Sequence, residues 1–260
     1  MAFGCKLVNE MISREELEKV SAARKTSLYF EEKEYLQYVF LHSVSRFAES
    51  FAFKGGTCLR ICHGFERASE DLDFSSSLSI QKTRKIFERC LKDFALLNIE
   101  QEVFSEKEFE GNIRFEARFK GPLFSGNRHS TNSLKIDFNK GKSRNTVAKA
   151  IPKLFSDIPV FTIQALAEKE ILAEKIRTLI NRGQARDLYD VWMLLQNKTP
   201  IDTKLLEAKL KEENSSISKL KMPEKQAYER DLKPLLNFLP PYKQVKEEAE
   251  KELKKIRPLH

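Results

Sequence analysis

The composition of the chain limits the classes of protein to which it can belong. It has 260 residues, of which 41% are hydrophobic and 32% are charged, and its mean hydropathy is -0.48. These values indicate a soluble protein with a hydrophobic core and one large or two modest domains. The apolar runs are too short to cross a bilayer, which excludes a membrane protein. The first residues lack the apolar stretch of a secretory signal and the four cysteines form no framework, so we expect a cytoplasmic location.

The charge balance of the chain is basic. The net charge is +8 and the isoelectric point is about 9.2. Such a balance favours polyanionic partners, either nucleic acid or a phosphate-rich substrate. A protein from a lysine-rich proteome has the same balance without such a partner, and the charge alone does not separate the two. The sequence contains no block of lysine and arginine long enough to be a dedicated nucleic-acid arm.

The first part of the chain mixes helical and strand patterns. Apolar residues recur at intervals of three and four in some stretches and alternate with polar residues in others. Ser13 is followed by acidic residues and is expected to cap the first helix. A polar and basic stretch at 141–150 predicts an exposed loop. We expect helices at 13–23, 31–51, 57–63 and 80–97, and strands at 52–54, 70–75, 98–104, 112–120, 133–139 and 160–163.

The second part of the chain has helical patterns only. We therefore predict two domains, an α+β domain at 1–162 and a helical domain at 163–260, with the change near Thr162. Helices are expected at 164–181, 186–196, 201–212, 222–238 and 242–256.

Two aspartates close together in the first part indicate a site. Asp71 and Asp73 are separated by one residue, so in a strand both side chains lie on one face, with Leu72 and Phe74 on the other. Two carboxylates on one face repel each other unless a positive charge lies between them, and a divalent metal is the usual solution. Glu70 adds a third negative charge nearby and is expected to point to the opposite face.

A glycine pair precedes the aspartates. Gly55 and Gly56 allow backbone N–H groups to approach a phosphate, and Thr57 is placed to cap a helix that points at the same anion. Ser69 lies two residues before Asp71, where a hydroxyl can bond the terminal phosphates. Arg67 either pairs with an acidic neighbour, Glu66 or Glu70, at the surface or contacts phosphate. Each feature alone is usually a turn or a solvated strand face, but together they predict a site for a metal-bound nucleoside triphosphate.

A third carboxylate comes from a later strand. Asp137 shares a polar strand face with Lys135, while Leu134 and Ile136 share the apolar face. Three carboxylates on neighbouring strands could hold two Mg²⁺ ions and promote in-line displacement at phosphorus. The alternative is that Asp137 is an ordinary surface residue.

The order Gly-Gly-Thr, Arg-x-Ser-x-Asp-x-Asp-Phe resembles the first motif of the DNA polymerase β superfamily of nucleotidyltransferases. More closely, it resembles the AbiEii-type toxins of bacterial type IV toxin–antitoxin systems. This resemblance implies an α+β fold, with a polymerase β-like nucleotidyltransferase sheet and flanking helices followed by a helical C-terminal half. It also implies a third carboxylate in a setting like Leu134-Lys-Ile-Asp137.

A second motif lies in the helical half, where Lys175 is followed by Asp187 and Asp190. Periodicity alone favours ordinary helix-surface charges, including an i,i+4 pair between Arg186 and Asp190. The AbiEii-type proteins, however, carry a similar Ala-Glu-Lys motif followed by Arg-Asp-x-x-Asp. The resemblance implies that Lys175 contacts nucleotide phosphates, that Asp187 supports it or the base, and that Asp190 contributes to nucleotide binding.

The resemblance implies a complete activity, that of a nucleotidyltransferase which uses an NTP with Mg²⁺ or Mn²⁺ and acts as the toxin of a toxin–antitoxin pair. It implies tRNA or another RNA as acceptor and a cognate antitoxin as partner, with Asp71 and Lys175 facing each other across a cleft. A protein or a small molecule is an alternative acceptor. Two further alternatives are an NTP-binding regulator without catalysis and a nucleic-acid-binding protein with structural acidic pairs.

Overall fold

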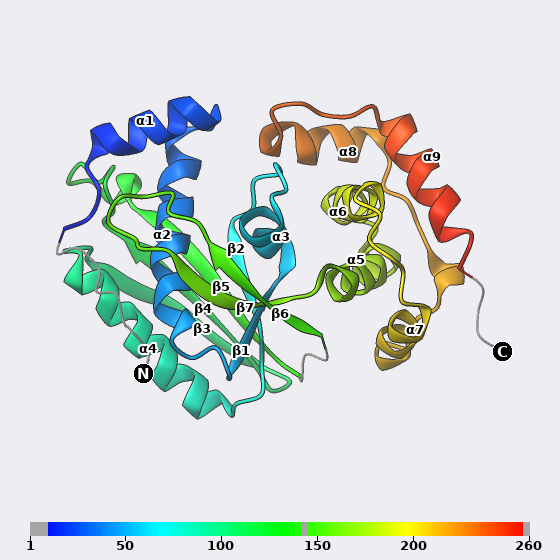
Figure 1. Ribbon diagram of the computed structural model, residues 1–260, viewed down its shortest axis with the longest axis horizontal. Coiled ribbons are helices and arrows are strands. Elements are labelled where there is room, and N and C mark those ends of the chain that lie inside the picture. The colour runs from blue at the N-terminus through cyan, green and yellow to red at the C-terminus, as the bar shows by residue number, and fades with distance from the viewer. Residues whose placement is uncertain (1–9, 142–144, 257–260) are drawn as a thin grey trace. The chain divides into compact units, whose positions relative to one another are not determined.

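A computed structural model of the chain describes residues 10–141 and 145–256. Residues 1–9, which include Cys5 and carry the expectation about a secretory signal, lie outside these ranges. The chain divides into two compact units (Figure 1). Unit 1 comprises the chain up to Cys62 together with Ser69–Ala165, and unit 2 comprises His63–Ala68 together with the chain from Leu166 onward.

Unit 1 is built on a mixed sheet of seven strands in the order β3-β4-β5-β2-β1-β7-β6. Strand β2 lies in the middle, antiparallel to β1 and parallel to β5, while β4 is antiparallel to both β5 and β3. The strands are β1 Phe51–Lys54, β2 Asp71–Ser76, β3 Gln101–Phe109, β4 Asn112–Phe119, β5 Asn132–Lys140, β6 Thr146–Ile151 and β7 Phe161–Leu166. The expected α+β class is confirmed.

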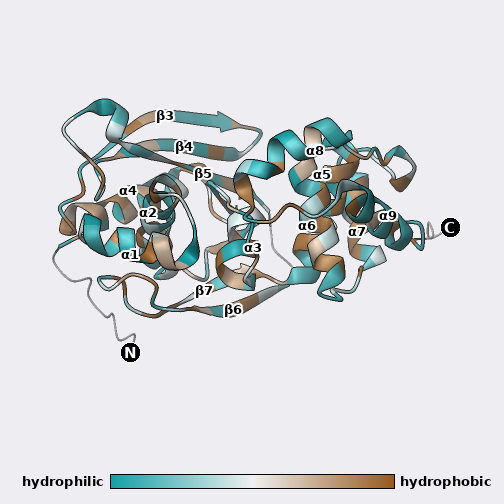
Figure 2. Ribbon diagram, turned by 90° about the horizontal axis from the view of Figure 1, so that it is seen from above, coloured by the Kyte–Doolittle hydropathy of each residue, from teal (hydrophilic) through white to brown (hydrophobic). Residues whose placement is uncertain are grey.

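Helices cover one face of this sheet. Figure 2 shows α2 and α4 on the same side of β3, β4 and β5. Ser13 and Ser79 cap α1 and α4 by accepting hydrogen bonds from backbone N–H groups, as Ser27 does for α2. The helices of unit 1 are α1 Arg14–Arg24, α2 Leu28–Ser45, α3 Gly55–His63 and α4 Ile80–Leu96, and η1 is a short turn at Arg128–Ser130.

The core of unit 1 is rich in phenylalanine. Phe74 of β2 is fully buried and its ring lies 5.2 Å from Phe138 of β5 and 5.3 Å from Phe53 of β1. The ring of Phe87 on α4 stacks on Phe115 of β4 at 3.8 Å. These contacts fix which face of each strand points inward, because moving a strand by one residue would put its polar side chains into this core.

Some expected boundaries are wrong. The helix expected at 31–51 ends at Ser45, and Phe51 begins β1. The stripe of apolar residues continues past the helix because the same core also receives the turn and the strand that follow. The loop expected at 141–150 contains β6, an edge strand with mostly exposed side chains, where polar residues are tolerated. Residues 142–144 lie outside the described chain. Strand β3 begins three residues later than expected and ends at Phe109.

Unit 2 is helical. The chain from His63 to Ala68 joins it through a hydrogen bond from the backbone N–H of Ala68 to the carbonyl of Leu235 at 2.9 Å. Its helices are α5 Glu168–Arg182, α6 Ala185–Gln196, α7 Thr203–Glu212, α8 Lys225–Leu232 and α9 Tyr242–Leu253, with short turns η2 Ile217–Lys219 and η3 Lys233–Leu235. Among the described residues, no helix combines the length and the apolar character needed to cross a membrane.

The substitution Phe74→Ala tests the phenylalanine core. We expect it to lower the free energy of unfolding by about 3–5 kcal/mol, because it leaves a cavity among aromatic rings. The exposed Leu96→Ala on α4, where the side chain is 62% accessible, is the matched control and should change it by less than about 0.5 kcal/mol. Urea unfolding followed by far-UV circular dichroism measures both. Equal effects of the two variants would contradict the packing described here.

Candidate active site

Three carboxylates lie on the face of the sheet in unit 1 that is opposite to its aromatic core, where Asp71 and Asp73 are partly exposed and Asp137 is buried. Asp71 and Asp73 point to this face from β2, whereas Leu72 and Phe74 are fully buried on the other, as predicted. Asp137 of β5 lies directly beside Asp73 in the register of the two parallel strands. The three side chains thus come from two hydrogen-bonded strands in the middle of the sheet, which fixes their backbone positions.

Two cations neutralise this carboxylate group. Nζ of Lys135 lies 2.6 Å from Oδ2 of Asp71, and Nε of Arg114 donates to Oδ1 of Asp137 at 2.7 Å. The hydrogen bond to Asp137 raises the pKa of Arg114. The sequence pattern placed Lys135 on this face but predicted a metal, and neither cation, as the partner of the carboxylates. The same alternation of charged and apolar residues in β4 was the signal that could have placed Arg114 there.

The carboxylates suit a hard divalent cation in chemical type and in strand position. Within the described ranges, however, no three Asp, Glu, His or Cys side chains are gathered closely enough to hold a metal. One oxygen of Asp71 is held by Lys135 and one oxygen of Asp137 by Arg114 in this structure.

Gly55 is required by the position of Asp73. It has a φ of +78°, and a Cβ at this position would lie 2.3 Å from Oδ2 of Asp73. Gly55 is also the first residue of α3, so the carboxylate of Asp73 lies against the start of a helix, where the backbone dipole favours negative charge. The group close to Gly55 in this structure is a carboxylate, so the role of the glycine pair in binding phosphate stays a prediction.

Thr57 does not cap this helix, contrary to our expectation. It is the third residue of α3, is fully buried, and donates a hydrogen bond from its hydroxyl to the backbone carbonyl of Asp71. Its hydroxyl thus ties α3 to the beginning of β2. The helix begins at Gly55, two residues earlier than the sequence suggested, and Gly55 has a positive φ there.

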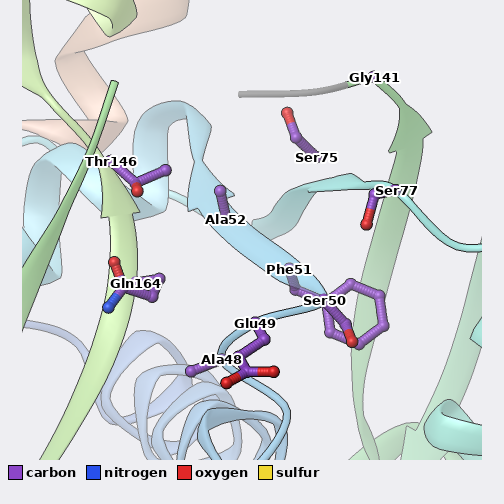
Figure 3. Close-up of a pocket in the computed structure, with 10 residues that line it drawn as sticks. All are labelled: Ala48, Glu49, Ser50, Phe51, Ala52, Ser75, Ser77, Gly141, Thr146 and Gln164. Atoms are coloured by element: carbon purple, nitrogen blue, oxygen red, sulfur yellow. The ribbon is translucent and has the colours of Figure 1, made fainter. Parts of the chain in front are cut away.

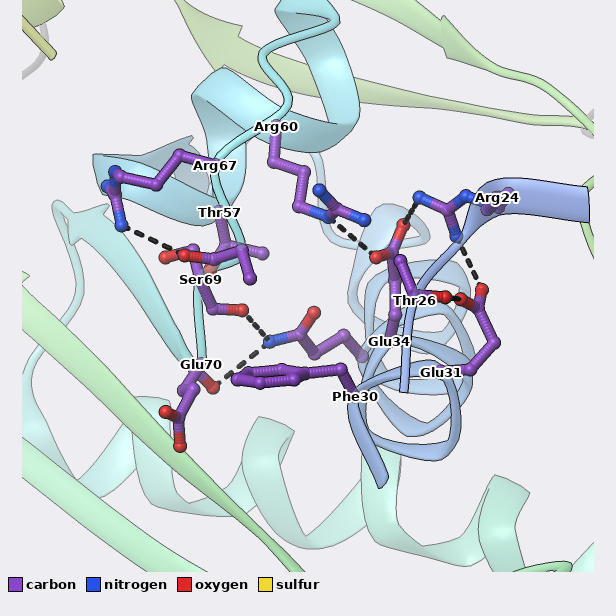
Figure 4. Close-up of polar contacts among 12 residues, drawn as sticks. Arg24, Thr26, Phe30, Glu31, Glu34, Thr57, Arg60, Arg67, Ser69 and Glu70 are labelled. Atoms are coloured by element: carbon purple, nitrogen blue, oxygen red, sulfur yellow. Dashed lines mark hydrogen bonds and ion pairs between the residues drawn. The ribbon is translucent and has the colours of Figure 1, made fainter. Parts of the chain in front are cut away.

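Helix α3 is held from the side by a network of buried charges. Nε of Arg60 donates to Oε2 of Glu34 at 2.6 Å, and Arg24 pairs with the other oxygen of Glu34 at 2.8 Å (Figure 4). Arg24 and Thr26 also bond Glu31, which is fully buried. Helices α1, α2 and α3 are thereby joined by ion pairs, and the network fixes the helix that follows the glycine pair.

The segment before β2 is held by α2. Nε2 of Gln37 donates to the carbonyls of Ser69 at 3.1 Å and Glu70 at 3.0 Å (Figure 4). The carboxylate of Glu70 lies 3.3 Å from Nζ of Lys33, so its charge has a partner on α2. Because β2 begins only at Asp71, the strand alternation does not determine where the hydroxyl of Ser69 points. Its role with phosphate stays a prediction.

Unit 2 contains a separate buried cluster of charges. Nζ of Lys175 on α5 lies 2.8 Å from Oδ2 of Asp190 and 3.3 Å from Oδ1 of Asp187, both on α6. Both aspartates are buried, and Oδ2 of Asp187 accepts no hydrogen bond among the described residues. The three residues that the sequence motif predicted are therefore brought together.

Arg67 belongs to the same cluster. Its Nε and Nη2 donate to the two oxygens of Asp190, each at 2.8 Å, and its Nη1 donates to the carbonyl of Ala68 at 3.0 Å. The expected surface pair with Glu66 or Glu70 is therefore wrong, and so is the pair of Arg186 with Asp190, since Arg67 and Lys175 take that carboxylate. With all three nitrogens engaged, the geometry favours a positioning role for Arg67 over a phosphate contact.

The cluster fixes the charges of its members. Burial lowers the pKa of an ammonium, but Asp190 and Asp187 outweigh it, and the pKa of Lys175 lies above its ordinary value. Burial also opposes ionisation of Asp190, but Arg67 and then Lys175 outweigh it and hold the pKa of Asp190 below its ordinary value. Lys175 is thus a cation at neutral pH and has no role as a base. Lys175 lies in unit 2 and Asp71 lies in unit 1, and the expectation that they face each other stays a prediction.

A pocket in unit 1 lies away from these carboxylates. It has a volume of about 460 Å³ and lies beside Phe51 and Ser75, near the ends of β1 and β2 that are opposite to Gly55 and Asp71 (Figure 3). Its polar lining is made of hydroxyls, one amide and one carboxylate, from Glu49, Ser50, Ser75, Ser77, Thr146 and Gln164. None of the predicted site residues lines it.

Comparison with known proteins identifies the family. The sequence profile described as "Nucleotidyl transferase AbiEii toxin, Type IV TA system" matches residues 39–256. The chain belongs to this family. It is therefore a nucleotidyltransferase toxin of the type IV toxin–antitoxin class, as the two motifs implied. A search of the curated proteins finds no match to the chain.

Solved structures show the same fold at low sequence identity. MenT4, a nucleotidyltransferase toxin from Mycobacterium tuberculosis H37Rv, is 18% identical and has a TM-score of 0.70, and the match covers 96% of this chain and 91% of MenT4. JHP933 from Helicobacter pylori is 19% identical with a TM-score of 0.57, and the match covers 88% of this chain and 92% of JHP933. The likeness thus extends over both units.

The close approach of Gly55 to Asp73 predicts the effect of Gly55→Ala. We expect a loss of at least about 2 kcal/mol in the free energy of unfolding, from the left-handed φ and from displacement of the Asp73 carboxylate. Gly126→Ala is the matched control, because Gly126 has a φ of +85° in the same unit but no atom within 4 Å of the position that a Cβ would take. Urea unfolding should show a clearly smaller loss for the control. Equal losses would mean that the contact with Asp73 has no energetic effect.

The buried cluster predicts the effect of Asp190→Asn. We expect a loss of about 3–5 kcal/mol in unfolding free energy, because Arg67 and Lys175 stay buried with one negative charge fewer. The folded-state pKa of Asp190 is lowered, so its contribution is complete above the unfolded value of about 3.9 and is lost as the pH falls through the folded value. Fluorescence of Trp192, the only tryptophan and a residue of α6, follows the unfolding. Asp231→Asn, at a partly exposed position of the same unit, is the control. A loss that persists unchanged below pH of about 3 would contradict this assignment.

Proposed function

We propose that this nucleotidyltransferase transfers a nucleoside monophosphate from an NTP to an acceptor hydroxyl, with tRNA or another RNA as the acceptor. The observation that carries the proposal is the group of three carboxylates on one face of the sheet, with Asp73 against the helix start at Gly55. Membership of the AbiEii family gives the class of reaction, and the basic charge of +8 suits a polyanionic acceptor.

The carboxylates would hold Mg²⁺ or Mn²⁺. The residues that would do so are Asp71, Asp73 and Asp137, after Lys135 and Arg114 have given up their contacts with Asp71 and Asp137. A bound divalent cation would supply charge to the triphosphate and lower the pKa of the attacking hydroxyl.

The residues of the chain would bind and orient the reactants. The acceptor oxygen forms a bond to the α-phosphorus while the bond from this phosphorus to the bridging oxygen breaks, so that pyrophosphate leaves and the hydroxyl proton passes to a carboxylate or to water. Gly56 and Ser69 would contact the phosphates. Lys175, a permanent cation held by Asp187 and Asp190, would offset the charge of the leaving pyrophosphate.

The family also implies a cognate antitoxin, and we propose that one exists for this chain. A cytoplasmic location accords with an activity on NTP and RNA. Both statements go beyond the family assignment itself.

Label transfer tests the proposed reaction. The protein is incubated with each α-labelled NTP, Mg²⁺ and total RNA, and we expect label in RNA, its loss on chelation, and recovery with Mg²⁺ or Mn²⁺. Asp71→Asn should lower the rate by roughly 100-fold or more, because it removes a carboxylate from the metal site. Glu88→Gln, an exposed carboxylate on α4, is the matched control.

Other outcomes would overturn parts of the proposal. Label in a protein or in an aminoglycoside would replace RNA as the acceptor. Binding of NTP without release of pyrophosphate, with every acceptor tried, would replace the enzyme with a nucleotide-binding regulator. Full activity of Asp71→Asn would remove the carboxylate group from the mechanism.

A further inference from the structure

The face of the sheet that carries the three carboxylates extends beyond them to the edge strand. Along β4 the apolar residues are buried toward α4, whereas Arg114, Glu116 and Arg118 point to the opposite face and are partly exposed. Strand β3, paired with β4, is the edge of the sheet and is exposed along most of its length. This face therefore continues from β2 across β5 and β4 to β3.

A bulge in β3 brings an aromatic ring onto this face. The register with β4 shifts between Val103 and Ser105, so Phe104 is the extra residue, and bulges of this kind redirect a side chain. The ring of Phe104 lies under the guanidinium of Arg118, 4.0 Å from ring centroid to Cζ, and Phe104 remains 40% exposed. A phenylalanine this exposed contributes little to the core and offers a ring edge or face to a ligand.

A second pair of the same kind lies at the other end of β3. The guanidinium of Arg114 lies 5.7 Å from the ring centroid of Phe109, which is also 40% exposed. Arg114 is the residue that holds Asp137, and Asp137 is beside Asp73. The register thus sets Lys107, Arg114, Asp137 and Asp73 in one row across four strands, about 14 Å from end to end.

Arg118 is only weakly paired on this face, so it can accept an anion. Nη1 of Arg118 is buried and has no hydrogen-bond acceptor among the described residues, and its ion pair with the largely exposed Glu102 is long, at 3.7 Å. A cavity of about 520 Å³ beside it is lined by the cations Lys120 and Arg128 and by the carboxylates Glu100 and Glu102, and Lys120 is paired with Glu100. Exposed ion pairs are weak, so a phosphate can replace Glu102 at small cost.

We propose that this face, which we name the β3–β4 platform and define as Phe104, Lys107, Phe109, Arg114 and Arg118, binds a single-stranded end of the acceptor RNA. Bases stack on Phe104 and Phe109, the cations contact phosphates, and the row through Arg114 leads the terminal hydroxyl to the carboxylates. The proposal rests on the proposed function, because it gives the acceptor a path to the same site. Half-exposed rings alternating with guanidinium groups favour a single strand over a duplex, whose bases are not available for stacking.

Direct binding tests the platform. A fluorescent single-stranded RNA of about 12 nucleotides and the same sequence as a blunt duplex are titrated with the full chain, and anisotropy is measured. The double variant Phe104→Ala/Phe109→Ala should bind the single strand at least about tenfold more weakly. Val103→Ala is the matched control, because Val103 is 42% exposed on the same strand but pairs with Ala117 on the opposite face. Arg118→Ala should reduce the slope of log affinity against log salt by about 0.7.

The outcomes separate the platform from the proposed reaction. NTP binding and label transfer are measured on the same proteins, and the double variant should keep its NTP affinity. Unchanged affinity of the double variant for the single strand would overturn the platform, even where label transfer to RNA proceeds. A loss of self-association in the double variant, with RNA binding intact, would make the face a protein contact and also overturn it. Absence of label transfer by the wild-type protein would instead overturn the proposed function.

Discussion

The position of the candidate active site depends on the two faces of β2. One face must pack Leu72 and Phe74 into a core of aromatic rings, and this requirement leaves no choice for Asp71 and Asp73, which must point outward together. The aromatic packing therefore determines where the carboxylates lie. It holds two like charges side by side, and the pairing with β5 brings Asp137 next to them. A stable core thus supports an electrostatically unfavourable arrangement on its surface.

Both units balance buried or crowded charges by the same means. In unit 1, Lys135 and Arg114 each take one carboxylate, and Arg24 and Arg60 enclose Glu34. In unit 2, Arg67 and Lys175 share Asp190. Pairs of this kind contribute little net stability compared with apolar packing, but removal of one partner is costly. They therefore specify where each charged group lies more than they increase the stability of the fold.

Much of the fold and of the candidate site could be predicted from local patterns. The alternation around Asp71 placed its side chain correctly. Periodicity favoured surface charges at Lys175 and Asp187, and only the family resemblance predicted that they meet. The contacts that were missed all join residues distant in the chain. Arg67 meets Asp190 across 123 residues, and Arg114 meets Asp137 across a strand pair, so neither contact leaves a local period in the sequence. Strand β6 was missed for a different reason, since an edge strand needs no apolar alternation.

The short stretch from His63 to Ala68 has a topological consequence for how the protein can be divided. It belongs to unit 2, although the chain on both sides of it belongs to unit 1, so the polypeptide crosses between the units three times. No single cut separates them. A fragment that begins after β7 would lack Arg67 and would leave Asp190 without its bidentate partner, and a fragment that ends there would carry an orphaned arginine. The two units of this toxin therefore alternate along the sequence. The segment that carries Arg67 in unit 2 leads directly into the strand that carries Asp71 and Asp73 in unit 1.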